Sequence, residues 1–212
     1  KLKKLKLNKL CEFVHFCCTS EDINNLSYSL MLQRFLDIEF IPEVNVLQKN
    51  LNSLAKKYSK VPMLAFTHGQ PASPTTLGKE FSNYSYRLKF HLDLIKSIKQ
   101  KGKFNGASGN YNAHVIAEKK VNWESLSKKF VNSFGLDFSS RSTQIELKDA
   151  MAFQLANTHN LNNVLIDFAQ DIWLLISKNY LKQNLKAGEV GSSTMPHKVN
   201  PIDFENAEGN LS

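Results

Sequence analysis

Apolar side chains recur every three or four residues along most of this 212-residue chain. That spacing is typical of helices that bury one face. No segment alternates apolar and polar residues as a half-buried strand does, and no internal repeat occurs at solenoid spacing. The pattern predicts an all-α fold, a bundle of long helices joined by polar loops. The longest predicted helix spans about residues 149–180, with an apolar stripe at Met151, Leu155, Leu161, Leu165, Phe168, Ile172 and Ile176.

Capping residues and prolines mark the ends of the other helices. Thr19 through Asp22 reads as a capping box that opens a helix with an apolar stripe at Ile23, Leu26, Leu30 and Met31. Pro42 suits the first position of a second helix, which should end before Val61-Pro62, because the residue before a proline avoids the α conformation. Further helices are expected from about Thr76 to about Lys101 and around residues 123–134, with breaks at 67–74 and 102–112.

Composition excludes several classes of protein. Hydrophobic residues make up 42% of the chain and charged residues 22%, as in globular proteins. No stretch reaches the ~18 uninterrupted apolar residues of a membrane span, and the N-terminal residues lack the apolar core of a secretory signal. Cys11, Cys17 and Cys18 form no zinc-like or even-numbered framework, which favours buried thiols in a reducing compartment. We therefore expect a cytoplasmic protein.

The net charge of +8 does not by itself indicate a nucleic-acid partner. The lysines are spread along the chain, and only residues 1–6 form a dense basic run. Solvated helix faces explain this distribution better than a nucleic-acid site, since no groove-reading motif or aromatic platform is evident. A basic balance also suits a substrate that carries carboxylates and a phosphate.

Residues 188–201 form the most informative loop, because two glycines flank small hydroxyl residues and a lysine follows. Such loops bind anions through oriented backbone N–H groups. Lys198 adds a full positive charge and Asn200 a neutral donor. From composition alone, an ordinary surface loop explains the segment equally well.

Two other places carry candidate chemistry. His68 precedes a glycine in a polar loop, and an imidazole titrates near neutrality, as a general acid must. Thr19 and Ser20 stand at a predicted helix N-terminus, where N–H groups and the helix dipole favour anions. A simple N-cap explains one of these two hydroxyls and leaves the other free.

Several strings resemble known enzymes. G-S-S-T-M-P-H-K-V-N-P at residues 191–201 is similar to the signature loop of the fumarase/aspartase superfamily, S-S-x-M-P-x-K-x-N-P, at every fixed position. Other segments resemble the adenylosuccinate lyase family within it: H-F-x-x-T-S-E-D-I-N at 15–24, T-H-G-Q-P at 67–71, N-G-A-x-G-N-Y-N-A-H at 105–114, T-Q-I-E at 143–146 and P-I-D-F-E-N at 201–206.

This resemblance implies a lyase that splits adenylosuccinate into AMP and fumarate by β-elimination, and that also cleaves the succinyl-carboxamide ribotide of purine synthesis. It implies Ser192 as the general base and His68 as the general acid. The substrate-binding residues that it implies are His15, Thr19, Ser20, Thr67, Gln144, Ser193, Lys198 and Asn200. No cofactor is implied. No histidines stand at zinc-binding spacing with a supporting carboxylate, so we expect no metal.

The resemblance also implies a domain organisation. Residues 1–212 would be the central helical lyase domain, with 1–18 as the junction from an N-terminal domain and 188–201 as the signature loop. The family's N-terminal and C-terminal domains would lie outside this chain. The family forms homotetramers whose active sites draw on three subunits, so we expect a homo-oligomer with shared sites and no activity from this segment alone.

Four alternatives stay open. The nearest is a sister lyase acting on argininosuccinate, aspartate or malate, and the second is a non-catalytic structural relative that keeps the fold. The third is a basic helical nucleic-acid module. The last is a membrane-surface helix at residues 1–10, where lysine alternates with leucine. Against these, the small-molecule lyase reading predicts neither a nucleic-acid nor a membrane partner.

Overall fold

A computed structural model describes residues 2–184, 194–195 and 199–212 of the chain. The chain divides into two compact units, each built from two stretches of sequence. The first unit comprises Lys1–Ile41 and Ser97–Gln154, and the second comprises Pro42–Lys96 and Leu155–Ser212.

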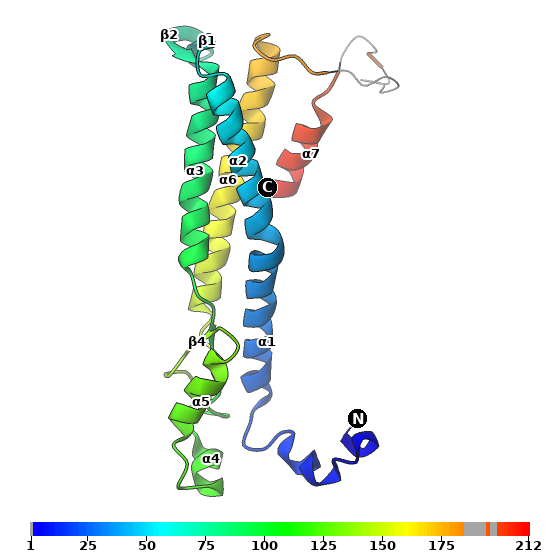
Figure 1. Cartoon of the computed structure of the whole chain (residues 1–212), viewed down its shortest axis with the longest axis vertical. Helices are drawn as coiled ribbons and strands as arrows, with labels where there is room; N and C mark the ends of the chain where they lie inside the picture. The colour runs from blue at the N-terminus through cyan, green and yellow to red at the C-terminus, as the bar shows by residue number, and fades with distance from the viewer. Residues whose placement is uncertain (1, 185–193, 196–198) are drawn as a thin grey trace. The chain divides into compact units, whose positions relative to one another are not determined.

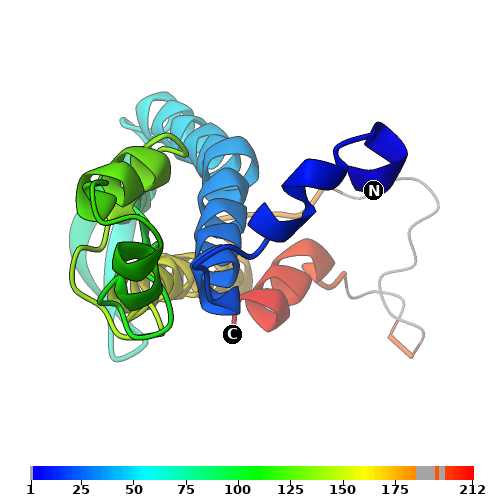
Figure 2. The ribbon, with the colours of Figure 1, turned by 90° about the horizontal axis from the view of Figure 1, so that it is seen from below.

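The first unit is organised around one long helix (Figures 1 and 2). Its elements in chain order are the 3-10 helices η1 (Leu2–Leu5) and η2 (Asn8–Phe13), α1 (Ser20–Phe35), the π-helical segment η3 (Leu36–Phe40), β3 (Lys101–Gly102), α4 (Asn112–Ala117), α5 (Trp123–Asn132) and β4 (Asp137–Phe138). The short strands β3 and β4 pair in parallel. Leu26, Val131 and Leu136 form the centre of its apolar core.

The second unit is a helix bundle with a hairpin at one end (Figure 1). Its elements are α2 (Ile41–Lys57), β1 (Pro62–Thr67), β2 (Gln70–Thr76), α3 (Leu77–Ser97), most of α6 (Asp149–Ser177) and α7 (Ile202–Leu211). Phe168 of α6 packs edge-on against Tyr84 of α3 and against Phe204 of α7. Buried Ser85 of α3 donates a hydrogen bond to Asn52 of α2 at 2.8 Å.

The predicted all-α class is confirmed, and the longest predicted helix, 149–180, is observed as α6. The expectation that no strand occurs is wrong, because β1 and β2 pair as an antiparallel hairpin. Pro71 and Pro74 lie within β2 and read from sequence as loop residues, since a proline offers no N–H to a strand ladder. The tight turn between Thr67 and Gln70 brings the two segments together, so they pair although their sequences lack the alternating pattern of a strand.

The prediction that Pro42 begins a separate second helix is wrong. Helical structure continues from α1 through η3 into α2, which starts one residue earlier at Ile41. A proline ring inside an α-helix clashes with the carbonyl one turn before it. The wider π-helical turn at Leu36–Phe40 relieves that clash, so the chain passes Pro42 without leaving the helix.

Two predictions about burial are also wrong. On α1, Leu26 is buried, whereas Ile23 and Met31 of the predicted apolar stripe are exposed. The buried face of α1 is largely polar and consists of Asp22, Asn25, Leu26 and Ser29. The three cysteines are partly exposed rather than buried.

Among the described residues, no helix is both long and apolar enough to cross a membrane.

Candidate functional site

The N-terminus of α1 is built by a capping box, as the sequence predicts. Thr19 is the N-cap residue in extended conformation, and its side chain and that of Asp22 cap the first turn reciprocally. The Thr19 N–H donates to Asp22 Oδ2 at 2.9 Å. Ser20 is the first helical residue and is exposed. The free N–H groups and the positive end of the helix dipole therefore lie beside two hydroxyl groups.

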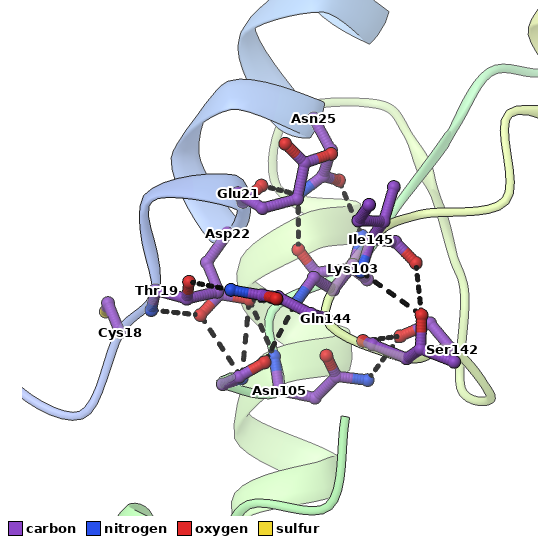
Figure 3. Close-up of polar contacts among 12 residues, drawn as sticks. Cys18, Thr19, Glu21, Asp22, Asn25, Lys103, Asn105, Ser142, Gln144 and Ile145 are labelled. Atoms are coloured by element: carbon purple, nitrogen blue, oxygen red, sulfur yellow. Dashed lines mark hydrogen bonds and ion pairs between the residues drawn. The ribbon is translucent and has the colours of Figure 1, made fainter. Parts of the chain in front are cut away.

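Asp22 also holds a buried ion pair (Figure 3). Its Oδ1 lies 2.9 Å from Lys103 Nζ, and both side chains have zero exposed surface. The same carboxylate accepts the N–H groups of Asn105 and Gly106 at 3.2 Å each. Lys103 Nζ donates in addition to the Gly106 carbonyl at 2.9 Å. A buried ion pair is tolerated when further hydrogen bonds satisfy both charges, and this pair meets that condition.

The polar face of α1 continues this arrangement along the helix. Asn25 Oδ1 accepts the Lys103 N–H at 2.8 Å, and Asn25 Nδ2 donates to the Lys103 carbonyl at 3.1 Å. One turn further on, Ser29 donates to the Lys101 carbonyl at 2.7 Å. These side chains satisfy the backbone of an irregular segment that would otherwise bury unpaired polar groups. They fix residues 101–106 against the start of α1.

Gln144 reaches the same helix end from a distant part of the sequence (Figure 3). Its Nε2 donates to Thr19 Oγ1 at 3.4 Å, and its side chain is exposed. The segment that carries it is anchored by Ser142, which accepts a hydrogen bond from Asn105 Nδ2 at 2.8 Å. Three of the predicted substrate-binding residues, Thr19, Ser20 and Gln144, are thus brought together by the fold.

His15 lies in the turn between η2 and α1 and is exposed. Within the described residues, no hydrogen bond joins its ring to Thr19 or Gln144. Partial burial raises the pKa of the Cys17 and Cys18 thiols beside His15. The nearby Asp22 carboxylate raises the pKa of Cys18 further.

The other candidate residues belong to the second unit. Thr67 pairs with Gln70 in the β1–β2 hairpin, which leaves His68 and Gly69 as a two-residue turn. Their φ angles are +53° and +74°. Positive φ at both central residues is the signature of a type I′ turn, whose twist matches that of the strands. Gly69 supplies the second positive φ of this turn, and His68 is exposed at its tip.

Only part of the signature loop falls within the described residues. Ser192, Ser193 and Lys198 lie outside them. Asn200 is half-buried just before α7, and its carbonyl accepts the Ile202 N–H at 2.9 Å. Gln183 Nε2 donates to the Val199 carbonyl at 2.7 Å. After the loop, α7 is attached to α6 by a 2.8 Å hydrogen bond that Gln170 Nε2 donates to Glu208 Oε1.

A cavity of about 270 Å³ also occurs in the second unit, between β1, α3 and α6. Its lining is mainly apolar and includes Met63, Phe66, Phe81, Phe168 and Asp171. Tyr84 donates a hydrogen bond to Asp171 there. None of the predicted site residues lines this cavity, so we do not regard it as the candidate active site.

Sequence reasoning missed the residues that support the site. Asp22 was recognised only as a helix cap, and Lys103 and Asn25 were not singled out. The available signal was three polar residues at positions 22, 25 and 29, which share one face of a helix. Across the described residues, no cluster of three or more histidine, cysteine, aspartate or glutamate side chains could hold a metal ion.

Comparison with known proteins agrees with the resemblance. A family model described as "Lyase" matches residues 2–212. Proteins named adenylosuccinate lyase from Haemophilus influenzae and Escherichia coli K12 are 49% and 48% identical over 98% and 97% of this chain. One from Legionella pneumophila is 50% identical over 97%. The chain spans only 46%, 45% and 45% of the lengths of these three relatives. A match along the whole chain to one family model shows that the chain belongs to the lyase family of the fumarase/aspartase superfamily.

Proposed function

We propose that this chain forms the central part of an adenylosuccinate lyase, which splits adenylosuccinate into AMP and fumarate and also cleaves the succinyl-carboxamide ribotide. The observation that carries this proposal is the likeness of nearly the whole chain, at 48–50% identity, to proteins named adenylosuccinate lyase. A sister lyase for argininosuccinate, aspartate or malate is the alternative, and it gains no support from these relatives.

The reaction requires a base, an acid and a cradle for negative charge. Removing a proton beside a carboxylate creates an intermediate with extra negative charge, which fixed donors must stabilise. We assign that task to Lys198 and Asn200, and the proton removal to Ser192, with Ser193 beside it. A serine hydroxyl is a weak base, so Ser192 needs neighbouring N–H groups and a cation to favour its alkoxide form. The signature string at residues 191–201 contains small residues with backbone N–H groups, and Lys198 supplies the cation.

His68 is assigned as the general acid that protonates the departing nitrogen. Its position at the tip of the hairpin turn leaves the imidazole accessible to a substrate. Thr67, the last residue of β1, is assigned to a substrate carboxylate. A turn of two residues can shift with little disturbance of the helices, which suits a group that must meet the substrate and then release the product.

Thr19, Ser20 and Gln144 are assigned to substrate binding at the start of α1. A helix N-terminus favours anions through its free N–H groups and its dipole. The Gln144 amide lies against the Thr19 hydroxyl and adds a donor and an acceptor at the same place. This arrangement suits a substrate that bears carboxylates next to a neutral heterocycle. His15 is assigned to the edge of the same site.

We further propose that the protein works as a homotetramer in the cytoplasm, with active sites shared between subunits. Large apolar side chains that are exposed on the described helices support association with other copies, which would remove them from water. They include Ile23, Tyr28, Met31 and Phe35 on α1 and Tyr86 and Phe90 on α3.

Fumarate release from adenylosuccinate tests the function, with argininosuccinate and aspartate as competing substrates, on the protein that carries this chain. We expect release from adenylosuccinate only. His68→Gln should lower kcat by about 10²- to 10⁴-fold, the range for a general acid. His159→Gln serves as the matched control, because His159 is an exposed histidine on α6 outside the assigned site. Absence of fumarate from every substrate would refute the proposal, and equal activity of the two variants would refute the role of His68.

A further inference from the structure

The hairpin that carries His68 is poorly stabilised by its own strands. A two-stranded hairpin is marginal in water without further packing. Pro71 and Pro74 remove two N–H donors from β2, and the register is irregular between Leu64 and Phe66. His68 adopts a left-handed conformation, which costs a residue with a Cβ more than it costs glycine. Something outside the hairpin must hold the turn in place.

The exit of α6 provides that support from the same unit. Lys178 Nζ donates to the Gly69 carbonyl at 3.3 Å, one residue after His68. The same ammonium group lies 3.9 Å from the centre of the Phe66 ring, two residues before His68. A cation over an aromatic face is attracted by the ring's quadrupole. Lys178 therefore contacts the turn on both sides of the histidine.

Tyr180 makes a second attachment. Its hydroxyl accepts the Leu64 N–H at 3.3 Å, at the irregular point of the β1–β2 register. Its ring meets Phe66 edge-on with ring centroids 6.0 Å apart. The Leu64 N–H thus gains an acceptor outside the hairpin.

The way α6 ends explains how both side chains reach the hairpin. Asn179 has a φ of +61°, and asparagine is among the residues that tolerate this conformation. The Tyr180 N–H bonds to the Leu175 carbonyl at 2.9 Å and the Asn179 N–H to the Ile176 carbonyl at 3.0 Å. This is the Schellman pattern of helix termination. It reverses the chain at Asn179 and places Lys178 and Tyr180 on either side of the reversal.

We propose that Lys178 and Tyr180 are positioning residues for His68, so that the end of α6 sets the orientation of the general acid in the proposed reaction. This inference rests on the proposed function. Lys178 should contribute more than Tyr180 to the orientation of His68, because it contacts residues on both sides of the histidine. The Tyr180 hydroxyl bonds to β1 at Leu64, which is further from His68 than the Lys178 contacts are.

Steady-state kinetics of Lys178→Met test the proposal. This variant should lower kcat about 10-fold while KM changes less than about 2-fold, because misplacing a reacting group slows the chemical step more than it weakens binding. Lys178→Arg should restore most of the loss, since a guanidinium also donates to a carbonyl and stacks on a ring. Lys182→Met is the matched control, an exposed lysine four residues further on, and it should leave kcat unchanged.

A double-mutant cycle separates positioning from a general structural effect. If Lys178 acts through His68, then Lys178→Met should cost nothing further in a His68→Gln background. Equal losses in both backgrounds, or an unchanged kcat in Lys178→Met alone, would overturn the proposal. Tyr180→Phe removes only the hydroxyl acceptor and should lower kcat about 2- to 3-fold, a smaller loss than that of Lys178→Met.

Backbone amide exchange provides a readout that does not depend on catalysis. Lys178→Met should speed exchange of the hairpin amides while the amides of α3 keep their protection. Faster exchange with normal kcat would leave Lys178 a structural residue and reject the positioning role. An inactive wild-type protein would reject the proposed function instead, whereas unchanged exchange would reject the attachment itself.

Discussion

The start of α1 and the β1–β2 hairpin both present candidate site residues, but they are held by opposite means. At the start of α1, the supporting groups are a charged pair with no exposed surface and a set of backbone hydrogen bonds to Asp22 and Asn25. At the hairpin, the supporting contacts come from Lys178 and Tyr180 and are open to solvent. The first region is therefore expected to be stiff and the second to open easily.

This difference matches the proposed division of labour. Residues that bind a substrate through fixed donors benefit from a rigid frame, because preorganised groups need no rearrangement during the reaction. A general acid delivers its proton at one step and must then make room for the product. Thr19, Ser20 and Gln144 occupy the rigid frame, whereas His68 sits on the turn.

The largest predicted effect comes from breaking the buried ion pair. Lys103→Met leaves the Asp22 carboxylate buried without its cation, which should lower the free energy of unfolding by about 3–5 kcal/mol. Urea unfolding followed by circular dichroism measures this as a lower midpoint. Lys89→Met provides the control, since the exposed Lys89–Asp93 pair should contribute no more than about 0.5 kcal/mol. Similar losses in the two variants would mean that the start of α1 is no stiffer than the surface.

The second prediction applies one substitution to both regions. Gly109 and Gly69 have φ angles of +79° and +74°, so alanine is strained at either position. A Cβ on Gly109 would also collide with the Ser142 carbonyl, whereas a Cβ on Gly69 meets open space. We expect Gly109→Ala to cost about 3 kcal/mol or more, because overpacking adds to the backbone strain of about 1–2 kcal/mol. Gly69→Ala should cost only the strain.

Gly209→Ala completes the comparison. Gly209 lies inside α7 with open space around its Cα, so the same change should stabilise that helix by about 0.5–1 kcal/mol. Thermal unfolding of the three variants measures the series. If Gly69→Ala proved as costly as Gly109→Ala, the hairpin turn would have to be packed as tightly as the loop around Gly109, which the Ser142 carbonyl crowds.

Much of this architecture is readable from the sequence, and the parts that are not share a physical cause. The period of apolar residues predicts α6, and the capping residues predict the start of α1 at Thr19. The hairpin was missed because proline-rich strands lack the alternating pattern, although the His68-Gly69 pair carries a turn signal. A periodic pattern of apolar residues indicates a face that buries apolar groups. It therefore does not predict a hairpin with few apolar residues or a buried face made of polar residues.

The candidate site shows the same limit. The motifs name Thr19 and Gln144, which the fold does bring together. They do not reveal that Asp22 and Asn25 face inward, because a buried polar face looks like a solvated one in sequence. Long-range pairing between Asp22 and Lys103 joins residues 81 positions apart, and no local pattern records such a pairing.

His114 on α4 extends the buried frame of the first unit. It is only 1% exposed, and neither ring nitrogen has a hydrogen-bond partner among the described residues. Its ring packs edge-on against the aromatic rings of Phe104, Tyr111 and Trp123. Burial lowers the pKa of His114 from its usual 6.5, partly opposed by the Asp22 carboxylate and reinforced by Lys103. The folded protein thus keeps this imidazole neutral where an unfolded chain would protonate it.

The third and smallest predicted effect follows from that lowered pKa. Below pH 6.5 the unfolded chain binds a proton at His114 that the folded chain does not, so stability should fall as the pH drops through 6.5 toward the folded-state pKa. His114→Phe keeps an aromatic ring without a titrating group and should reduce this acid sensitivity while leaving the unfolding midpoint near pH 8 almost unchanged. Urea midpoints measured from about pH 8 to pH 5 test this prediction. His91→Phe is the comparison in the second unit, because burial also lowers the pKa of His91 and the two variants show which histidine causes the acid sensitivity. An acid sensitivity that survives in His114→Phe and disappears in His91→Phe would place the weak point on α3, and the start of α1 would then be the more acid-resistant of the two regions.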